Sequence, residues 1–238
     1  MSRIIAFDLR GPVAHYRRPD TLGSHASYPF ITRTALRGLI GAVLGLDGSE
    51  LLPAEARTGL RLCRPVRTVA QELSLHGKTW TARSGKINEF HRPTSIELVV
   101  NPHYRVYYAG PRLDDLASRL GRGQSVYHTY LGSAFCLTVP ERMEVKPAEP
   151  VPAGVSRLTC TTVVPSAAIG SMPELSNGRR IARVGGLLVD HLGGRRFRGT
   201  VSVLYDPEGG PLTFAPAAAT DAFWEFRQVP GEGVVCLW

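Results

Sequence analysis

The N-terminal stretch decides how the fold begins: residues 2–46 read SRIIAFDLRGPVAHYRRPDTLGSHASYPFITRTALRGLIGAVLGL. Residues 2–9 carry apolar side chains among β-favouring residues and predict a strand, which a Gly-Pro pair ends. Residues 13–33 then form a long loop that contains two prolines. From residue 33 to 45 apolar residues recur at helical spacing, which predicts an amphipathic helix. The stretch therefore predicts a strand, a loop and a helix in that order.

The predicted helix has clear boundaries. Thr32 or Thr34 can cap its start, and a glycine can end it. Two glycines, Gly38 and Gly41, lie inside it. Each costs about 1 kcal/mol relative to alanine in a helix, and close packing on a sheet is the expected compensation.

The loop 13–33 is long, polar, basic and aromatic, and loops of this length inside a domain are usually functional. Its residues His15, Tyr16, Arg17 and Arg18 are of the types that cleave RNA without a metal, by a base, an acid and a cation around one phosphate. The same residue types also bind phosphate without chemistry. Both interpretations stay open on the sequence alone.

Further strands and a second helix follow in a recognisable order. Residues 60–75 and 96–109 predict two strands that flank a polar tip and form a long hairpin, about 64–105, projecting from a body. A short helix near residues 113–120 and a strand near 134–139 come next. The order strand, helix, strand, strand, helix, strand predicts an α+β, ferredoxin-like (RRM-like) domain over residues 1–140.

The remainder of the chain has a different composition. Residues 140–153 hold four prolines, and residues 141–153 are expected to be a linker. Residues 154–238 show no long helical pattern and predict short strands separated by glycine and proline, which makes a β-rich C-terminal region.

Charge indicates a polyanionic partner. The 238 residues contain 28 Lys and Arg against 20 Asp and Glu, a net charge of +8, and three of the basic residues are lysines. Arginine binds phosphate with two parallel hydrogen bonds and stacks on bases. The predicted hairpin tip interleaves basic residues with Trp80 and Phe90, a pattern typical of nucleic-acid binding.

Several function classes find no support. The sequence has no P-loop, no dinucleotide fingerprint, no metal-spaced His or Cys pair and no C-x-x-C, so no cofactor is expected. No apolar run approaches the roughly 20 residues of a membrane helix. Four widely spaced cysteines and no signal peptide lead us to expect a cytoplasmic protein.

Three segments resemble one known family. Residues 11–46, residues 85–108 (GKINEFHRPTSIELVVNPHYRVYY) and residues 127–135 (YHTYLGSAF) resemble CRISPR-associated protein family five, most closely its type I-B branch. The resemblance covers roughly the first 140 residues. One departure is Ile31-Thr32, where the family usually has paired prolines.

The resemblance implies a non-catalytic subunit of a Cascade-type, RNA-guided surveillance complex that has a ferredoxin-like body and a long hairpin thumb. Such a subunit binds the 5′ handle of the CRISPR RNA, caps the filament of backbone subunits, seats the large subunit and meets target DNA through the complex. The RNA-binding residues it implies are His15, Tyr16, Arg17, Arg18, Tyr28, Arg33, Thr34, Arg37, Arg83, Lys86, His91, Arg92, Tyr130 and Gly132.

Within this set, the arginines are expected at handle phosphates and the loop aromatics at unpaired bases, while Gly132 would let its loop approach the RNA closely. Two alternatives remain. A related branch, type I-C, cleaves the repeat RNA itself, and Lys86, His91 and Arg92 add to the loop residues that such an endoribonuclease would need. A stand-alone RNA-binding module would instead carry aromatic sequences on its central strands, and these are missing.

Overall fold

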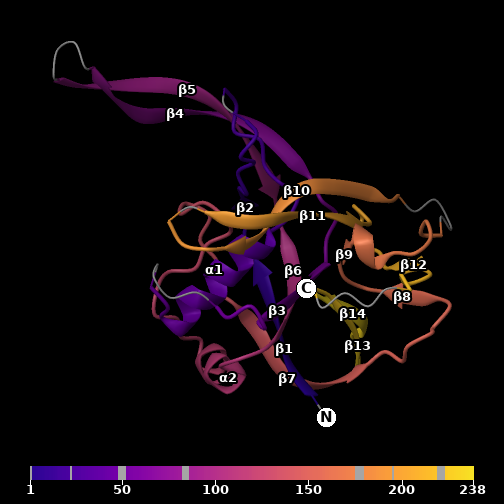
Figure 1. The fold of residues 1–238 in the computed structure, drawn as a ribbon. Coiled ribbons are helices and arrows are strands. Elements are labelled where there is room, and N and C mark those ends of the chain that lie inside the picture. The colour runs from indigo at the N-terminus through magenta and orange to yellow at the C-terminus, as the bar shows by residue number, and fades with distance from the viewer. Residues whose placement is uncertain are drawn as a thin grey trace.

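The predicted first strand is β1, Ser2–Arg10, which lies inside the main sheet between β6 and β7 (Figure 1). The structure is a computed structural model that describes residues 2–21, 23–47, 52–81, 86–174, 180–194, 196–218 and 223–238. Ile5 and Phe7 of β1 point into the main core, and Ile4 and Ala6 into a smaller apolar cluster on the other face. Because both faces of β1 are covered, its central residues 4–7 are all apolar.

The other elements are β2 Val13–Ala14, α1 Arg33–Leu44, β3 Arg57–Leu62, β4 Thr68–Thr81, β5 Lys86–Val100, β6 His103–Ala109, α2 Leu113–Gly121, β7 Glu141–Pro150, β8 Leu158–Cys160, β9 Val164–Pro165, η1 Ser166–Ala168, β10 Ala182–His191, β11 Phe197–Tyr205, β12 Leu212–Phe214, β13 Glu225–Val229 and β14 Gly233–Leu237. Strands dominate the described residues, so the fold is mainly β rather than balanced α+β.

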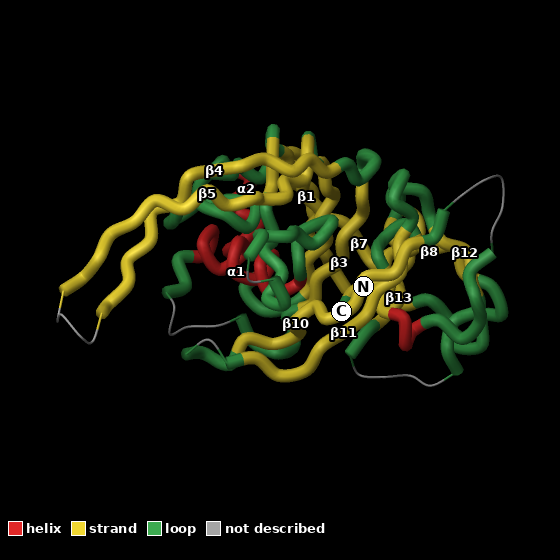
Figure 2. The backbone as a smooth tube through the Cα atoms, turned by 90° about the horizontal axis from the view of Figure 1, so that it is seen from above, coloured by secondary structure: helices red, strands yellow, loops and turns green. Residues whose placement is uncertain are grey.

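The main sheet has eight strands in the order β12-β8-β14-β13-β7-β1-β6-β3. Strands β7, β1, β6 and β3 pair antiparallel, and together with α1 and α2 they contain the predicted succession of strand, helix, strand, strand, helix, strand. Both helices lie against one face of this part of the sheet (Figure 2). The last strand of the succession is β7, however, and not the predicted strand near 134–139, which makes only an isolated bridge between Tyr130 and Leu137.

The prediction of a linker over residues 141–153 is wrong. Residues Glu141–Pro150 form β7, which pairs with β1 along most of its length and with β13 only at Glu149 and Pro150. Pro147 therefore lies where one side of the strand needs no partner, and a residue without an N–H is tolerated there. Strand β7 joins the N-terminal and C-terminal halves into one continuous sheet.

Helix α1 begins and ends as its sequence predicts. The Thr32 side chain accepts a hydrogen bond from the Ala35 N–H (3.3 Å), and Gly45 takes the left-handed conformation that stops the helix. The stripe that contains Leu36 and Ile40 is buried. Strand β10 packs on another side of α1, so the C-terminal region covers the helix instead of forming a separate unit.

Strands β4 and β5 form a long hairpin that extends away from the body (Figures 1 and 2). At its base, β5 pairs with β2, and Ile96 bridges His25 of the loop. Toward the body, residues 94–100 of β5 are buried or half-buried. Toward the tip, Phe90, His91 and Arg92 are exposed. A two-stranded ribbon without a covered face has little stability of its own, so the outer hairpin depends on its base.

No helix among the described residues is both long and apolar enough to cross a membrane.

Candidate nucleic-acid interface

The loop 13–33, the start of α1 and the loop 130–133 enclose an open cavity of about 280 Å³, here called the loop cavity. Six of the predicted RNA-binding residues line it: His15, Tyr16, Arg17, Tyr28, Thr34 and Gly132. Five further residues line it without having been predicted to bind RNA, namely Pro19, Thr32, Ala35, Ser133 and Leu188. Segments more than 100 residues apart in the sequence thus meet at one place, as the three family-like segments imply.

Glu97 of β5 fixes the shape of the loop. Its backbone carbonyl accepts a hydrogen bond from His15 Nδ1 (2.8 Å), and its carboxylate accepts one from the Ser27 N–H (2.9 Å). The Ser27 hydroxyl in turn accepts from the Tyr16 N–H (2.9 Å). The sequence did not indicate Glu97, because a single glutamate on a strand carries no signal. The base of the hairpin therefore supports the cavity.

His15 is buried and has a defined tautomer. A carbonyl only accepts, so the bond to Glu97 places a proton on Nδ1 and leaves Nε2 as the acceptor of the neutral ring. Nε2 is buried and has no hydrogen-bond partner among the described residues. The ring stacks against His25, with centroids 6.3 Å apart.

The predicted base-stacking tyrosines of the loop expose little ring surface. Tyr16 is 3% exposed and Tyr28 is 6% exposed, and burial raises the pKa of both hydroxyls. The Tyr28 hydroxyl donates to the Gly186 carbonyl (2.8 Å), which ties the loop to β10. These two rings therefore shape the wall of the cavity and offer a ligand an edge rather than a face.

A group of basic residues beside the loop cavity is not balanced by acids. Arg17 is exposed, and its guanidinium makes no ion pair or hydrogen bond within the described ranges. Burial, and after it the charges of Arg17, His15 and Arg92, lower the pKa of His25. The charges of Arg92, on β5, and of Arg17 thus both act on His25. The charge of Arg17, which no acid balances among the described residues, attracts an anion.

The other predicted arginines are committed to the protein itself. Arg18 makes a bidentate pair with Asp20 (2.7 and 3.1 Å). Arg33 is 5% exposed, donates to the Val189 carbonyl (3.3 Å) and lies 3.6 Å from Asp190, and burial lowers its pKa to about 10. In this structure the Arg33 guanidinium is therefore buried and paired within the protein.

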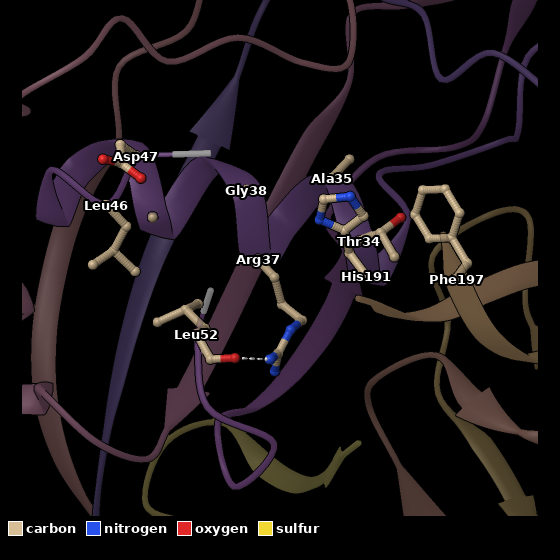
Figure 3. Close-up of a pocket in the computed structure, with 10 residues that line it drawn as sticks. Thr34, Ala35, Arg37, Gly38, Leu46, Asp47, Leu52, His191 and Phe197 are labelled. Atoms are coloured by element: carbon tan, nitrogen blue, oxygen red, sulfur yellow. Dashed lines mark hydrogen bonds between the residues drawn. The ribbon is translucent and has the colours of Figure 1, made fainter. Parts of the chain in front are cut away.

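Arg37 lies at a different cavity, of about 460 Å³, between α1 and the tips of β10 and β11 (Figure 3). Its guanidinium donates to the carbonyls of Leu52 (2.5 Å) and Ala56 (2.6 Å), so it closes the segment after α1. His191 and Phe197 form the opposite wall, with ring centroids 5.1 Å apart. This arrangement gives Arg37 a structural role and does not place it in the loop cavity.

The remaining predicted residues divide between the hairpin and the loop 130–133. Arg83 and the Lys86 side chain lie outside the described residues, and His91 is exposed on β5 beside His76. Tyr130 is 44% exposed. Gly132 has φ +86°, and a Cβ there would lie 2.1 Å from the His15 carbonyl oxygen. The close approach that requires this glycine is to the protein backbone, not to a ligand.

The opposite face of the sheet has a different character. Arg105 donates to Asp8 (3.1 Å), Glu144 (2.7 Å) and Glu232 (2.9 Å), and the Tyr107 hydroxyl donates to Glu232 as well. Burial alone would raise the pKa of Asp8, but hydrogen bonds from His103 and Arg105 outweigh it and leave that pKa below its ordinary value. Among the described residues of β7, β1, β6 and β3, no aromatic side chain is exposed as it would be in a stand-alone RNA-recognition module.

The described part of the chain contains no group of three or more His, Cys, Asp or Glu side chains placed to hold a metal ion.

Comparison with solved structures supports the fold. A chain described as "CRISPR RNA-guided surveillance complex" superposes with a TM-score of 0.52 at 16% identity, covering 92% of this chain and 94% of that chain. A "CRISPR protein from Archaeoglobus fulgidus" superposes with a TM-score of 0.55 at 9% identity, covering 98% of both chains. Comparison with curated proteins gave no match.

The amino-acid sequence of the chain matches one protein family over most of its length. Residues 4–169 match the family described as CRISPR-associated protein (Cas_Cas5). The matched region includes the loop 13–33, the start of α1 and the loop 130–133, which supply all but one of the residues that line the loop cavity. Because the match spans more than half of the chain, this chain belongs to the CRISPR-associated protein family Cas_Cas5.

Proposed function

We propose that the chain is a non-catalytic subunit of a CRISPR RNA-guided surveillance complex and that it binds the 5′ handle of the CRISPR RNA at the loop cavity. The observation that carries the proposal is the convergence of six predicted RNA-binding residues on one open cavity, among them the exposed Arg17. An unbalanced basic rim attracts phosphates, and a cavity of this size admits a nucleotide edge. Family membership supplies the biological setting.

The finer roles follow the family resemblance. The chain is of the type I-B kind, its β1 to β7 body is ferredoxin-like, and the hairpin β4–β5 is its thumb. Arg83, Lys86, His91 and Arg92 of the hairpin lie along the guide RNA where the first backbone subunit begins. The chain caps the backbone filament, seats the large subunit, meets target DNA through the complex and functions in the cytoplasm.

The absence of catalysis is part of this proposal. The endoribonuclease alternative requires a base and an acid around one phosphate. His15 is the one histidine that lines the loop cavity among the described residues, and its Nδ1 is engaged by the Glu97 carbonyl. Its other ring nitrogen, Nε2, is buried, so it is not placed to take a proton from a 2′-hydroxyl bound in the cavity.

The test uses the purified chain with end-labelled CRISPR repeat RNA in a metal chelator, analysed by a mobility-shift gel and a denaturing gel. We expect a shifted, intact RNA whose 5′-handle segment is protected. Site-specific cleavage that is lost in His15→Ala would establish the nuclease instead. Absence of both binding and cleavage, also after co-expression with the backbone subunits, would overturn the proposal.

A further inference from the structure

A second cavity, of about 390 Å³, opens next to the loop cavity and is here called the tyrosine cavity. Ala35, Gly38 and Ala42 of α1 form its floor, and Tyr127 and Tyr130 of the following loop lie on its wall. The tyrosine cavity and the loop cavity share two lining residues, Ala35 and Gly132. The two cavities therefore lie next to each other, with these two residues between them.

The space above Gly38, in the floor of the tyrosine cavity, is not explained by packing within the protein. Gly38 is exposed, and a Cβ built on it would meet nothing within 4 Å. The expectation that Gly38 packs closely on the sheet is thus wrong. Glycine costs a helix about 1 kcal/mol relative to alanine, and here no contact within the described chain offsets that cost. A ligand that lies flat on α1 would use the space that a side chain at this position would fill.

The wall presents aromatic rings from a fixed frame. Tyr127 is 49% exposed and Tyr130 is 44% exposed, so each offers part of its ring to solvent. The Tyr127 N–H donates to the Ala42 carbonyl (3.1 Å), which holds the loop against the end of α1. Two hydrogen bonds close the loop from the other side. The Thr129 hydroxyl donates to the Thr138 carbonyl, and the Thr138 N–H donates to the Thr129 carbonyl (3.1 Å).

The chemistry of the lining selects the ligand. Among the described residues that line the tyrosine cavity, none is a lysine or an arginine, so a phosphate has no cation inside it. Small aliphatic groups below and tyrosine and histidine rings beside them suit a planar, uncharged aromatic group. Stacking of a nucleobase on an aromatic side chain contributes about 1–3 kcal/mol. The cation Arg17 lines the neighbouring loop cavity, where the phosphates would pass.

We propose that the tyrosine cavity is a second nucleotide site, which takes an unstacked base of the RNA strand whose phosphates meet Arg17. The inference rests on the proposed function, because it extends the same RNA path by at least one nucleotide. Tyr127, Tyr130 and Gly38 then determine the affinity for that base, and Gly38 is the residue that allows the base to lie on the helix.

The decisive variant is Gly38→Leu. Its Cβ meets no clash and leucine favours a helix, so we expect a protein that unfolds at a higher temperature than wild type. The added side chain fills the cavity, so we expect affinity for CRISPR repeat RNA to fall about tenfold, the loss of one stacked base. Gly38→Ala separates the gain in stability from the loss of RNA affinity, because alanine also favours the helix but leaves most of the tyrosine cavity empty. Ser118→Leu on the exposed face of α2 is the matched control for added surface leucine.

Substitutions of Tyr127, on the wall of the tyrosine cavity, test the same site independently of Gly38. Tyr127→Ala should weaken RNA binding about tenfold and Tyr127→Phe should retain binding, because the ring and not the hydroxyl makes the stack. RNA carrying a photoreactive 5-iodouracil should cross-link to Tyr127 in wild type and lose that cross-link in Gly38→Leu.

The outcomes separate the two proposals. If wild type binds no repeat RNA, the proposed function fails. If Arg17→Ala weakens binding while Gly38→Leu and Tyr127→Ala bind as wild type does, the loop cavity stands and the second nucleotide site is overturned. If Gly38→Leu keeps its RNA affinity but no longer co-purifies with backbone subunits, the cavity holds a protein side chain and the inference is again overturned.

Discussion

The two faces of the central sheet use arginine in opposite ways. On the face away from the helices, here called the ionic face, Arg105 donates hydrogen bonds to three carboxylates and is 8% exposed. On the helical side, Arg17 is exposed and without an acidic partner within the described ranges. An arginine surrounded by carboxylates holds strands together, whereas an arginine left without them keeps its charge available for a ligand. The difference teaches that net charge alone says little about where a polyanion binds.

The largest effect is expected on the ionic face. Arg105→Ala removes the shared partner of Asp8 and Glu232 but leaves Asp8 its bond to His103 and Glu232 its bond to Tyr107. We therefore expect the free energy of unfolding to fall by about 3–4 kcal/mol, toward the low end for a broken buried pair, measured by urea denaturation. RNA affinity per folded molecule should not change. Arg122→Ala, an exposed arginine that bonds only to Ser118 among the described residues, is the control and should stay within about 0.5 kcal/mol of wild type. A loss of about 1 kcal/mol or less for Arg105→Ala would show that the network behaves as a surface pair.

The next effect links the loop cavity to the fold. Gly132→Ala places a Cβ against the His15 carbonyl at a left-handed φ, and we expect a loss of about 3 kcal/mol together with weaker RNA binding. Gly123→Ala has a similar φ (+63°) in open space and isolates the backbone cost of about 1 kcal/mol. Thermal unfolding of both variants measures the difference. Equal losses would mean that the contact between residue 132 and His15 contributes nothing.

A smaller effect is expected from the charge at the loop cavity. Arg17→Ala should weaken repeat-RNA binding about tenfold and reduce the slope of log affinity against log salt by about 0.7, the value of one phosphate contact. Arg157→Ala removes an equal charge from an exposed pair with Glu174 and is the matched control. An unchanged slope in Arg17→Ala, measured by fluorescence anisotropy over a salt series, would remove Arg17 from the RNA path.

The smallest effect concerns acid. The pKa of Asp8 is lowered in the folded protein, so its contribution to stability is present above the unfolded carboxyl value of about 3.9 and is lost as pH falls through the lower folded pKa. Wild type should therefore lose stability more steeply below about pH 4 than Asp8→Asn does. Denaturation midpoints across that range provide the measurement, and parallel curves would assign the acid sensitivity to other carboxylates.

Local signals in the sequence were sufficient where one segment determines its own structure. The helix at α1, with Thr32 at its start and Gly45 at its end, follows from capping and periodicity. The loop 13–33 was singled out by its length and residue types, and it lines the cavity. The linker at 141–153 was mistaken because proline content is read locally, while pairing with β1 is a property of the whole sheet.

The sequence by itself determined the succession of strands and helices, the family, and the residue types available to an RNA. Only the tertiary structure decided which of those residues meet. It turned Arg33 and Arg37 inward to carbonyls, brought Glu97 beneath His15, and left Gly38 open next to Tyr127. The physical reason is that burial and hydrogen-bond partners arise from segments distant in the chain, and composition or spacing along one segment carries no record of them.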